Sequence, residues 1–278
     1  MEFDPGPVQE PFATLVGEAP GADVYPPADF RVEWGPVFHR GRLDGTARIL
    51  VVGQDPGQHE AIARRILVGE AGQRAQGFLA KLGIDRDYVM INTYLYSVFG
   101  QHGGEKHADD PAIAGPRERW LDALFATSPI EAVISFGHLG RIAFERWRDG
   151  DGAAHAGVPF ESLTHPTQPE AVARQGSGKR AEAMVAMLAQ WNGALERLAP
   201  VVGAEPPVPY GDDLTPEDRS PIPAFDLPAG SPPWFSSLRQ WASREATGKF
   251  ADGDDAARDE AKRATIVITV PRAERPWH

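Results

Sequence analysis

The sequence predicts an α/β fold, in which a small sheet of four parallel strands is flanked by helices. Four short apolar runs have the length and composition of buried strands, at 47–53, 88–92, 131–136 and 160–164. Segments with apolar residues at three- and four-residue spacing lie between these runs and after the last, at 59–66, 74–83, 117–127, 139–149 and 179–199. Strands that alternate with helices in this order are typical of βαβ units, which build a parallel sheet.

The segments on either side of this core differ from it in composition. Residues 1–46 are rich in proline, glycine and acidic residues, and their aromatic cluster (Phe30, Trp34 and Phe38) indicates an irregular extension packed on the core. Nine prolines between 205 and 233 argue against a helix or a central strand there. A short helix over 234–247, an acidic loop and an edge strand over 265–270 are expected to follow. The predicted organisation is an N-terminal extension (1–46), a core (47–204) and a Pro-rich, acidic C-terminal extension (205–278).

Composition narrows the functional classes. The chain has no cysteine, which excludes disulfides, thiolate nucleophiles, iron–sulfur clusters and cysteine-bound zinc. No apolar run approaches the roughly 20 residues needed to span a bilayer, and no secretion signal is evident at the N-terminus. We therefore expect a cytoplasmic protein that does not enter a membrane, and a monomer is the default expectation.

The net charge of −11 argues against a nucleic-acid partner, because phosphate contacts normally use clustered Lys and Arg. The acidic residues are unevenly placed, however: residues 205–260 hold twelve acidic and five basic residues, whereas 47–204 hold eighteen and sixteen. A core close to neutral can still carry a basic face. The candidate basic residues are Arg64, Arg65, Arg74, Arg174, Lys179 and Arg180.

Polar residues stand at the end of each predicted strand. They are Gln54 and Asp55 after the first, Asn92 at the end of the second, His138 after the third and His165 after the fourth. Ligands of open parallel sheets bind at the carboxyl ends of the strands, so these side chains are predicted to surround one crevice. Each alone also fits an ordinary structural role, such as a turn-capping Asp, a buried amide or a hydrogen-bonded turn His.

These strand ends resemble the motifs of uracil-DNA glycosylases: GQDPG at 53–57, Asn92 closing the second strand, and His165-Pro166 after the fourth. The resemblance covers about residues 47–199. It implies the three-layer α/β/α fold of that family and hydrolysis of the N-glycosidic bond of deoxyuridine in DNA, with no metal or cofactor. The implied partners are uracil-containing DNA, the abasic-site product and free uracil.

The resemblance also implies roles for individual residues. Asp55 would position the attacking water and stabilise the cation that develops on the sugar. His165, as a neutral imidazole, would donate a hydrogen bond to the uracil oxygen beside the breaking bond. Asn92 can pair with both O4 and N3–H of uracil, which discriminates against cytosine. Gln54 is expected to line the same base pocket.

Two positions depart from the family pattern. Leu67 stands where relatives with a GEAPG-type first motif have a Phe that stacks on the flipped base, so the stacking partner is Leu67 or a ring from elsewhere. Nearby rings in the sequence are Phe78, Tyr94 and Phe99. Gly57 stands where the best-known members have a Tyr that blocks the thymine methyl, and Glu60 is the candidate to replace that function.

Two loops are predicted to contact DNA. Loop 166–178 resembles the segment that enters the minor groove, where Val172 or Arg174 would fill the space of the flipped base. Ser177 and Lys179 would hold phosphate. Loop 100–110 corresponds to a segment in which one branch of the family carries a histidine that traps the sugar covalently, and His107 is the candidate for such a covalent or product contact.

Three alternatives stay open at this point. The first is a metal-dependent nucleotide or phosphoester hydrolase, with ligands drawn from Asp55, His59, Glu60, His138 and His165. The second is a protein that binds uracil or abasic DNA without turnover. The third is an α/β protein with an unrelated crevice.

Overall fold

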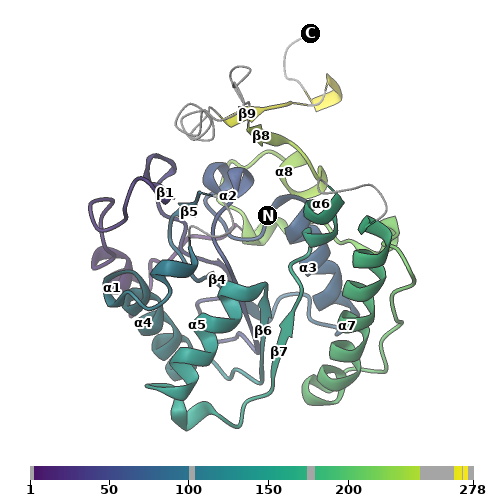
Figure 1. Cartoon of the computed structure of the whole chain (residues 1–278), viewed down its shortest axis with the longest axis horizontal. Helices are drawn as coiled ribbons and strands as arrows, with labels where there is room; N and C mark the ends of the chain where they lie inside the picture. The colour runs from purple at the N-terminus through teal and green to yellow at the C-terminus, as the bar shows by residue number, and fades with distance from the viewer. Residues whose placement is uncertain (1–2, 100–103, 174–178, 245–265, 271, 275–278) are drawn as a thin grey trace.

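The computed structural model describes residues 3–99, 104–173, 179–244, 266–270 and 272–274. Its central sheet holds four parallel strands, β3 (Ile49–Gly53), β4 (Tyr88–Asn92), β6 (Ala132–Phe136) and β7 (Phe160–Leu163). These strands confirm the predicted parallel sheet (Figure 1). A fifth strand, β2 (Arg40–Gly41), pairs antiparallel with β4, giving the order β2-β4-β3-β6-β7. The predicted number of four strands is therefore corrected to five.

Helices cover both faces of this sheet. Along β3, Ile49 and Val51 pack in one apolar cluster and Leu50 and Val52 in another, since alternate residues of a strand point to opposite faces. The first cluster is closed by α3 (Gly69–Lys81) and α7 (Lys179–Val202), and the second by α4 (Pro111–Thr127) and α5 (His138–Asp149). The three-layer α/β/α arrangement is therefore confirmed (Figure 1).

The first crossover helix is shorter than the sequence predicts. The helix expected over 59–66 is α2 (Gln58–Ala63), and it ends because Arg64 adopts a left-handed conformation with φ of 56°. Leu67 is also left-handed, with φ of 51°. The chain therefore makes a compact turn between α2 and α3.

The N-terminal extension packs against the loop that follows β4. Its elements are α1 (Phe12–Gly17), β1 (Phe30–Arg31) and a 3₁₀ turn (Val32–Trp34). Strand β1 pairs antiparallel with β5 (Ser97–Val98), and Phe30 is buried beside Tyr94. This pairing brings Arg31 next to the segment that leaves the carboxyl end of β4.

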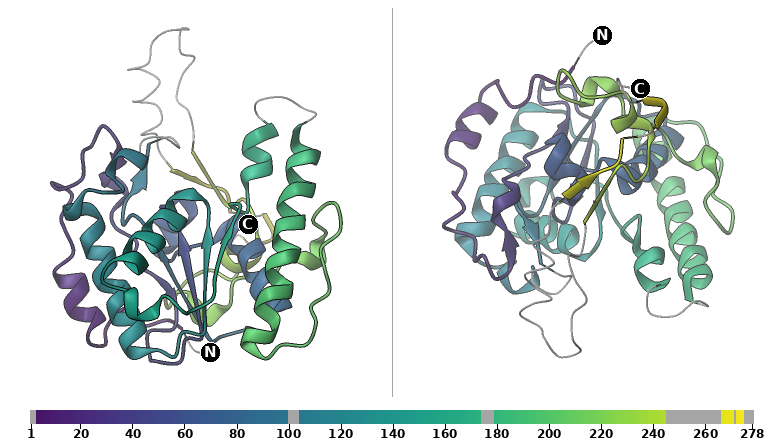
Figure 2. Two further views of the ribbon diagram at one scale, coloured as in Figure 1. Left: turned by 60° about the horizontal axis from the view of Figure 1, so that its bottom comes forward. Right: turned by 90° about the horizontal axis from the view of Figure 1, so that it is seen from above.

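The C-terminal extension crosses the sheet edge and returns over the carboxyl ends of the strands (Figures 1 and 2). Asp226 anchors it, because the buried Asp226 carboxylate lies 3.2 Å from Nη1 of Arg40 and also accepts a hydrogen bond from the Tyr88 hydroxyl. Helix α8 (Trp234–Ser237) has four residues, so the helix predicted over 234–247 is wrong for residues 238–244, and residues 245–247 lie outside the described ones. Residues of that range form β8 (Ala242–Arg244) instead.

The strand predicted over 265–270 is present as β9 (Ile266–Ile268), but it pairs antiparallel with β8 in a separate two-stranded sheet. The remaining short elements are α6 (Gln168–Ala173) and 3₁₀ turns at Glu105–His107, Ala153–His155, Pro216–Asp218, Ala224–Asp226 and Arg272–Glu274. Within the described residues no helix is long and apolar enough to cross a membrane. The division at residues 46 and 204 stays a prediction.

Candidate functional site

A pocket of about 1300 Å³ lies at the carboxyl ends of β3, β4, β6 and β7. Every strand-end side chain singled out in the sequence lines it: Gln54, Asp55, Asn92, His138 and His165. The structure therefore brings together, in one cavity, a carboxylate, two amides and two imidazoles that are far apart in the sequence.

Asp55 is held by the loop that follows β4. Its Oδ2 accepts a hydrogen bond from the backbone N–H of Val98 at 2.9 Å. Burial raises the pKa of Asp55 to about 6, against the opposing effects of that hydrogen bond and of the charges of Arg31 and Arg244. The carboxylate is therefore mostly ionised at neutral pH and titrates just below it.

Asn92 closes β4 directly beside Gly53 of β3, its partner in the parallel register. A Cβ atom on Gly53 would lie 2.3 Å from Oδ1 of Asn92, so the side chain occupies space that only glycine leaves. Asn92 is only 2% exposed, its side chain lines the pocket, and no hydrogen bond of its amide is found within the described residues. A buried amide with both donor and acceptor unused is suited to binding a polar ligand.

His165 follows β7, and its ring nitrogens have different environments. Nδ1 accepts a hydrogen bond from the backbone N–H of Thr167, with 3.3 Å between the two nitrogens. The proton of the neutral ring therefore sits on Nε2. Burial, and then the charge of Arg74, lower the pKa of His165 to about 4. At neutral pH His165 is therefore an uncharged hydrogen-bond donor.

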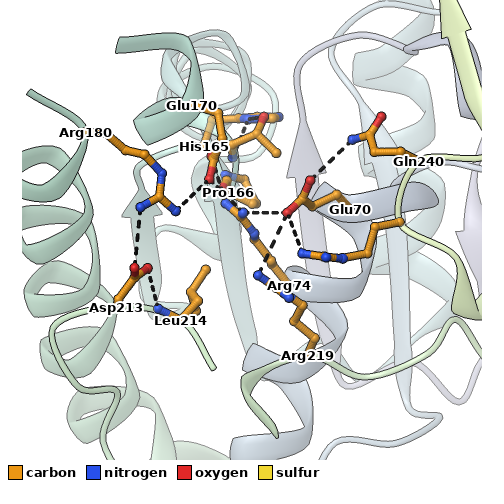
Figure 3. A network of polar contacts seen from close by, with 12 residues as sticks. Glu70, Arg74, His165, Pro166, Glu170, Arg180, Asp213, Leu214, Arg219 and Gln240 are labelled. Carbon is orange, nitrogen blue, oxygen red and sulfur yellow. Dashed lines mark hydrogen bonds and ion pairs between the residues drawn. The ribbon is translucent and has the colours of Figure 1, made fainter. Parts of the chain in front are cut away.

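A buried arginine supports the turn that carries His165 (Figure 3). The Arg74 guanidinium, 1% exposed, donates to the backbone carbonyl of Pro166 and lies 2.8 Å from Oε1 of Glu170 and 2.7 Å from Oε1 of Glu70. Arg74 belongs to α3, whereas Pro166 and Glu170 belong to the turn after β7 and to α6. These contacts therefore fix the turn against the core.

Comparison with protein-family models matches residues 40–191 to the Uracil DNA glycosylase superfamily. The chain belongs to this superfamily. The match spans the whole central sheet and covers more than half of the chain, and it supports a glycosylase-type hydrolase that acts in DNA repair. A search of curated proteins finds no match.

The superfamily match does not include the residues that close two sides of the pocket. Arg31 and Trp34 come from the N-terminal extension, and Gln240 and Arg244 from the C-terminal extension. Sequence reasoning missed all four as site residues, because only the folded chain brings these segments to the strand ends. The aromatic cluster that includes Trp34 was the one available signal.

Glu60 is fixed by backbone donors from two turns. Its Oε2 accepts from the N–H of Gly57 at 3.0 Å, and its Oε1 accepts from the N–H of Val68 at 3.2 Å. Burial raises the pKa of Glu60 to about 7. Leu67, which precedes Val68, also lines the pocket, so Glu60 ties the turn after Asp55 to the turn that presents Leu67.

Gln54 is positioned by the loop that follows β6. Its Oε1 lies 3.4 Å from the backbone N–H of Leu139, and a Cβ atom on Gly137 would lie 2.7 Å from Cδ of Gln54. Gly137 also has φ of 90°, in the region that favours glycine. Glycines at both 53 and 137 thus leave room for the two amides of the site.

The aromatic rings expected near Leu67 lie elsewhere. Phe78 is buried between the sheet and its helices, Tyr94 packs on the N-terminal extension, and Phe99 lies under the Arg31 guanidinium. Among the described residues that line the pocket, Trp34 is the only Phe, Tyr or Trp. Its ring lies 4.9 Å from the Arg31 guanidinium carbon.

The predicted DNA-contact residues lie outside this pocket or outside the described residues. Arg174 and Ser177 belong to the undescribed range. Val172 is half-buried in α6, and Lys179 is exposed at the start of α7; neither lines the pocket. His107 does not line it either, and its Nε2 lies 2.9 Å from Oδ2 of Asp29.

The arginines that the sequence suggested for a basic face make contacts within the protein wherever they are described. Arg64 donates to backbone carbonyls, Arg65 pairs with Asp4, and Arg74 is buried as described above. Arg180 lies between two carboxylates. These guanidinium groups serve internal contacts, because the extensions and the β7–α6 turn pack against them.

The described residues offer no ligand set for a metal-dependent hydrolase, since no three His, Asp or Glu side chains among them are grouped closely enough to hold a metal ion. Two of the candidate ligands already have other partners. His59 accepts a hydrogen bond from the backbone of Ala242, and both oxygens of Glu60 accept backbone N–H groups.

Proposed function

We propose that this protein excises uracil from DNA by hydrolysing the N-glycosidic bond of deoxyuridine, leaving an abasic site. The supporting observation is that Asp55, Asn92 and His165 line one pocket at the strand ends of a uracil DNA glycosylase superfamily fold. The products are free uracil and abasic DNA, and the protein acts as a monomer without a metal.

The reaction separates charge, and the pocket offers a group for each sign. As the bond between C1′ and N1 breaks, positive charge grows on the sugar and negative charge on the base. The Asp55 carboxylate stabilises the cation and orients the water that attacks C1′. The Nε2–H of neutral His165 donates to the uracil oxygen nearest N1, so it stabilises the leaving anion without delivering a proton.

Base selection rests on Asn92. Its amide NH₂ donates to O4 of uracil and its Oδ1 accepts from N3–H, whereas cytosine presents a donor and an acceptor in the opposite order. A mismatched base would leave this buried amide unpaired, which costs about 1 to 3 kcal/mol for each unsatisfied group. Gln54 contributes a second amide to the same pocket.

Because Gly57 and Leu67 differ from the family pattern, other residues must exclude thymine and stack on the base, or Leu67 itself must do the stacking. A Cβ atom on Gly57 would lie 2.9 Å from Oε2 of Glu60, so the Glu60 carboxyl fills space that Gly57 leaves open, and we assign it the exclusion of the thymine methyl. Stacking has two candidates, Leu67 and Trp34. Val172, Arg174, Ser177 and Lys179 remain predicted DNA contacts, and His107 would have to leave Asp29 to reach the product.

The test is cleavage of a labelled duplex with one uracil opposite guanine, in EDTA, followed by alkali and a denaturing gel. Wild type is expected to cut only at uracil. Asp55→Asn, which keeps an oxygen for the Val98 N–H, and His165→Ala are expected to lose at least about a hundredfold in rate. Asp149→Asn is the matched control, because Asp149 is 73% exposed and outside the pocket.

The same duplexes distinguish the remaining alternatives. Binding of uracil or abasic DNA in a gel shift without cleavage by folded wild type would refute the enzyme proposal in favour of a binding protein. Activity that EDTA abolishes would point to the metal-dependent hydrolase.

A further inference from the structure

The C-terminal extension places an arginine in the pocket. Arg244 ends β8 and is exposed, yet it lines the same cavity as Asp55 and lies near enough for its charge to act on that carboxylate. Arg244 stands well beyond residue 191, where the superfamily match ends. Its position is therefore a feature of this chain and not of the matched core.

The strand that carries Arg244 packs against helix α2, which begins three residues after Asp55. His59 of α2 is buried, and its Nε2 accepts a hydrogen bond from the backbone N–H of Ala242 at 3.2 Å. The His59 ring also meets Trp241 edge-on at 4.8 Å, and Trp241 stacks on Phe235 at 3.9 Å. Since burial lowers the pKa of His59 to about 4, it stays a neutral acceptor and this attachment holds at neutral pH.

Arg244 is also the lining cation best placed to meet a ligand. Three basic side chains line the pocket within the described residues: Arg31, Arg141 and Arg244. Arg31 is 2% exposed and donates to the Ser97 hydroxyl and the Val98 carbonyl. Arg141 is half-buried, and its charge is not among those that act on the Asp55 carboxylate. Arg244 is the exposed one of the three.

We propose that Arg244 binds a phosphate of the DNA strand that carries the target nucleotide, next to the flipped sugar. This inference rests on the proposed function, which places the deoxyribose against Asp55. A phosphate flanks that sugar on each side, and bringing a phosphodiester near the Asp55 carboxylate is unfavourable unless a cation stands between them. A guanidinium fits this role because it can hold two phosphate oxygens at once.

The decisive measurement is the salt dependence of DNA binding. The probe is a duplex with a tetrahydrofuran abasic-site analogue, which cannot be turned over, and affinities are measured from 50 to 200 mM KCl. For one lost phosphate contact, the slope of log K against log salt should fall by about 0.9. Arg244→Gln should thus weaken binding roughly tenfold at 50 mM, and this defect should shrink about 3.5-fold by 200 mM.

Two further variants make the result specific. Arg244→Lys keeps the charge and should retain most of the salt slope while losing part of the affinity, because Lys lacks the two-pronged geometry. Arg119→Gln is the matched control: Arg119 is exposed on α4, outside the pocket, and its loss changes the net charge equally. Arg119→Gln should leave the affinity within about twofold of wild type and the salt slope unchanged.

Several outcomes would overturn the proposal. One is an unchanged salt slope in Arg244→Gln with an intact melting temperature. Another is a change confined to the pH dependence of single-turnover cleavage, which would mean that Arg244 only tunes Asp55. Wild type that binds the duplex but does not cleave uracil DNA would refute the proposed activity while leaving the Arg244 test valid, and wild type that binds no duplex would refute both.

Discussion

Gly53→Ala tests whether the exact position of Asn92 controls activity. The new Cβ would lie 2.3 Å from Oδ1 of Asn92, whereas ordinary van der Waals contact begins near 3.4 Å, so the amide must retreat by about 1 Å. A displacement of this size in a positioned group costs about a hundredfold in rate. Gly53 lies in β3 and is not among the positive-φ glycines, so alanine strains no backbone there.

The assay is single-turnover cleavage of the uracil duplex under subsaturating conditions, which gives kcat/KM, together with a thermal melt. Gly115→Ala in α4 is the matched control, because a Cβ there meets nothing within 4 Å, and activity should be unchanged. A double-mutant cycle isolates the cause: in an Asn92→Ala background, Gly53→Ala should have less than about a twofold effect.

Either of two results would show that the position of Asn92 does not control activity. Gly53→Ala could retain the kcat/KM of wild type, or it could lower the rate equally with and without the Asn92 side chain. The second outcome would mean that the added methyl acts on the backbone of β3 and not through the amide.

The contacts of Asp55, Glu60 and Arg74 can each be tested by measurement. Cleavage should fall about tenfold from pH 7 to pH 5, since the pKa of Asp55 is raised to about 6 and protonation removes the required anion; a flat single-turnover profile would contradict this. Glu60→Ala should lower the free energy of unfolding by about 2 to 4 kcal/mol, because two backbone N–H groups lose their acceptor. Urea unfolding measures this free energy, and a loss below about 1 kcal/mol would contradict the prediction. Arg74→Met should lower the free energy of unfolding by about 2 to 3 kcal/mol in the same urea assay. It should also reduce kcat/KM about tenfold, because the turn that carries His165 loses its support. Wild-type values for both quantities would disprove the positioning role.

The parallel strands and main helices of the core were predictable because their patterns are local. Strands buried on both faces are apolar throughout, and long amphipathic helices repeat their apolar residues every three or four positions. The two-residue strand β2 (Arg40–Gly41) carries no such pattern and forms only because β4 offers a free edge. The helix expected over 234–247 is also shorter than predicted, because tertiary contacts decide the structure there. Its described apolar residues pack against α2 and α3 and do not form one stripe along a helix.

Some residues of the site could also be predicted from the sequence, and others could not. Asp55, Asn92 and His165 were predictable as neighbours, because a parallel sheet places the ends of its strands along one edge. Trp34 and Arg244 could not be predicted as site residues, since each is brought to the pocket by packing between distant segments. No local pattern in the sequence encodes that β1 pairs with β5 or that β8 docks on α2.

The acidic composition was a poor guide to the partner, because it counts charges without locating them. Asp226 pairs with Arg40 inside the protein, Asp218 lies 3.0 Å from Nζ of Lys81, and neither carboxylate lines the pocket. These two acidic side chains therefore attach the C-terminal extension to the core. A phosphate responds mainly to charges within a Debye length, about 8 to 10 Å at physiological salt, so the local field at the strand ends decides whether DNA can approach. There, Arg31 and Arg244 stand close enough to Asp55 to favour its ionised form. The extension that makes the chain acidic also supplies one of these two positive charges.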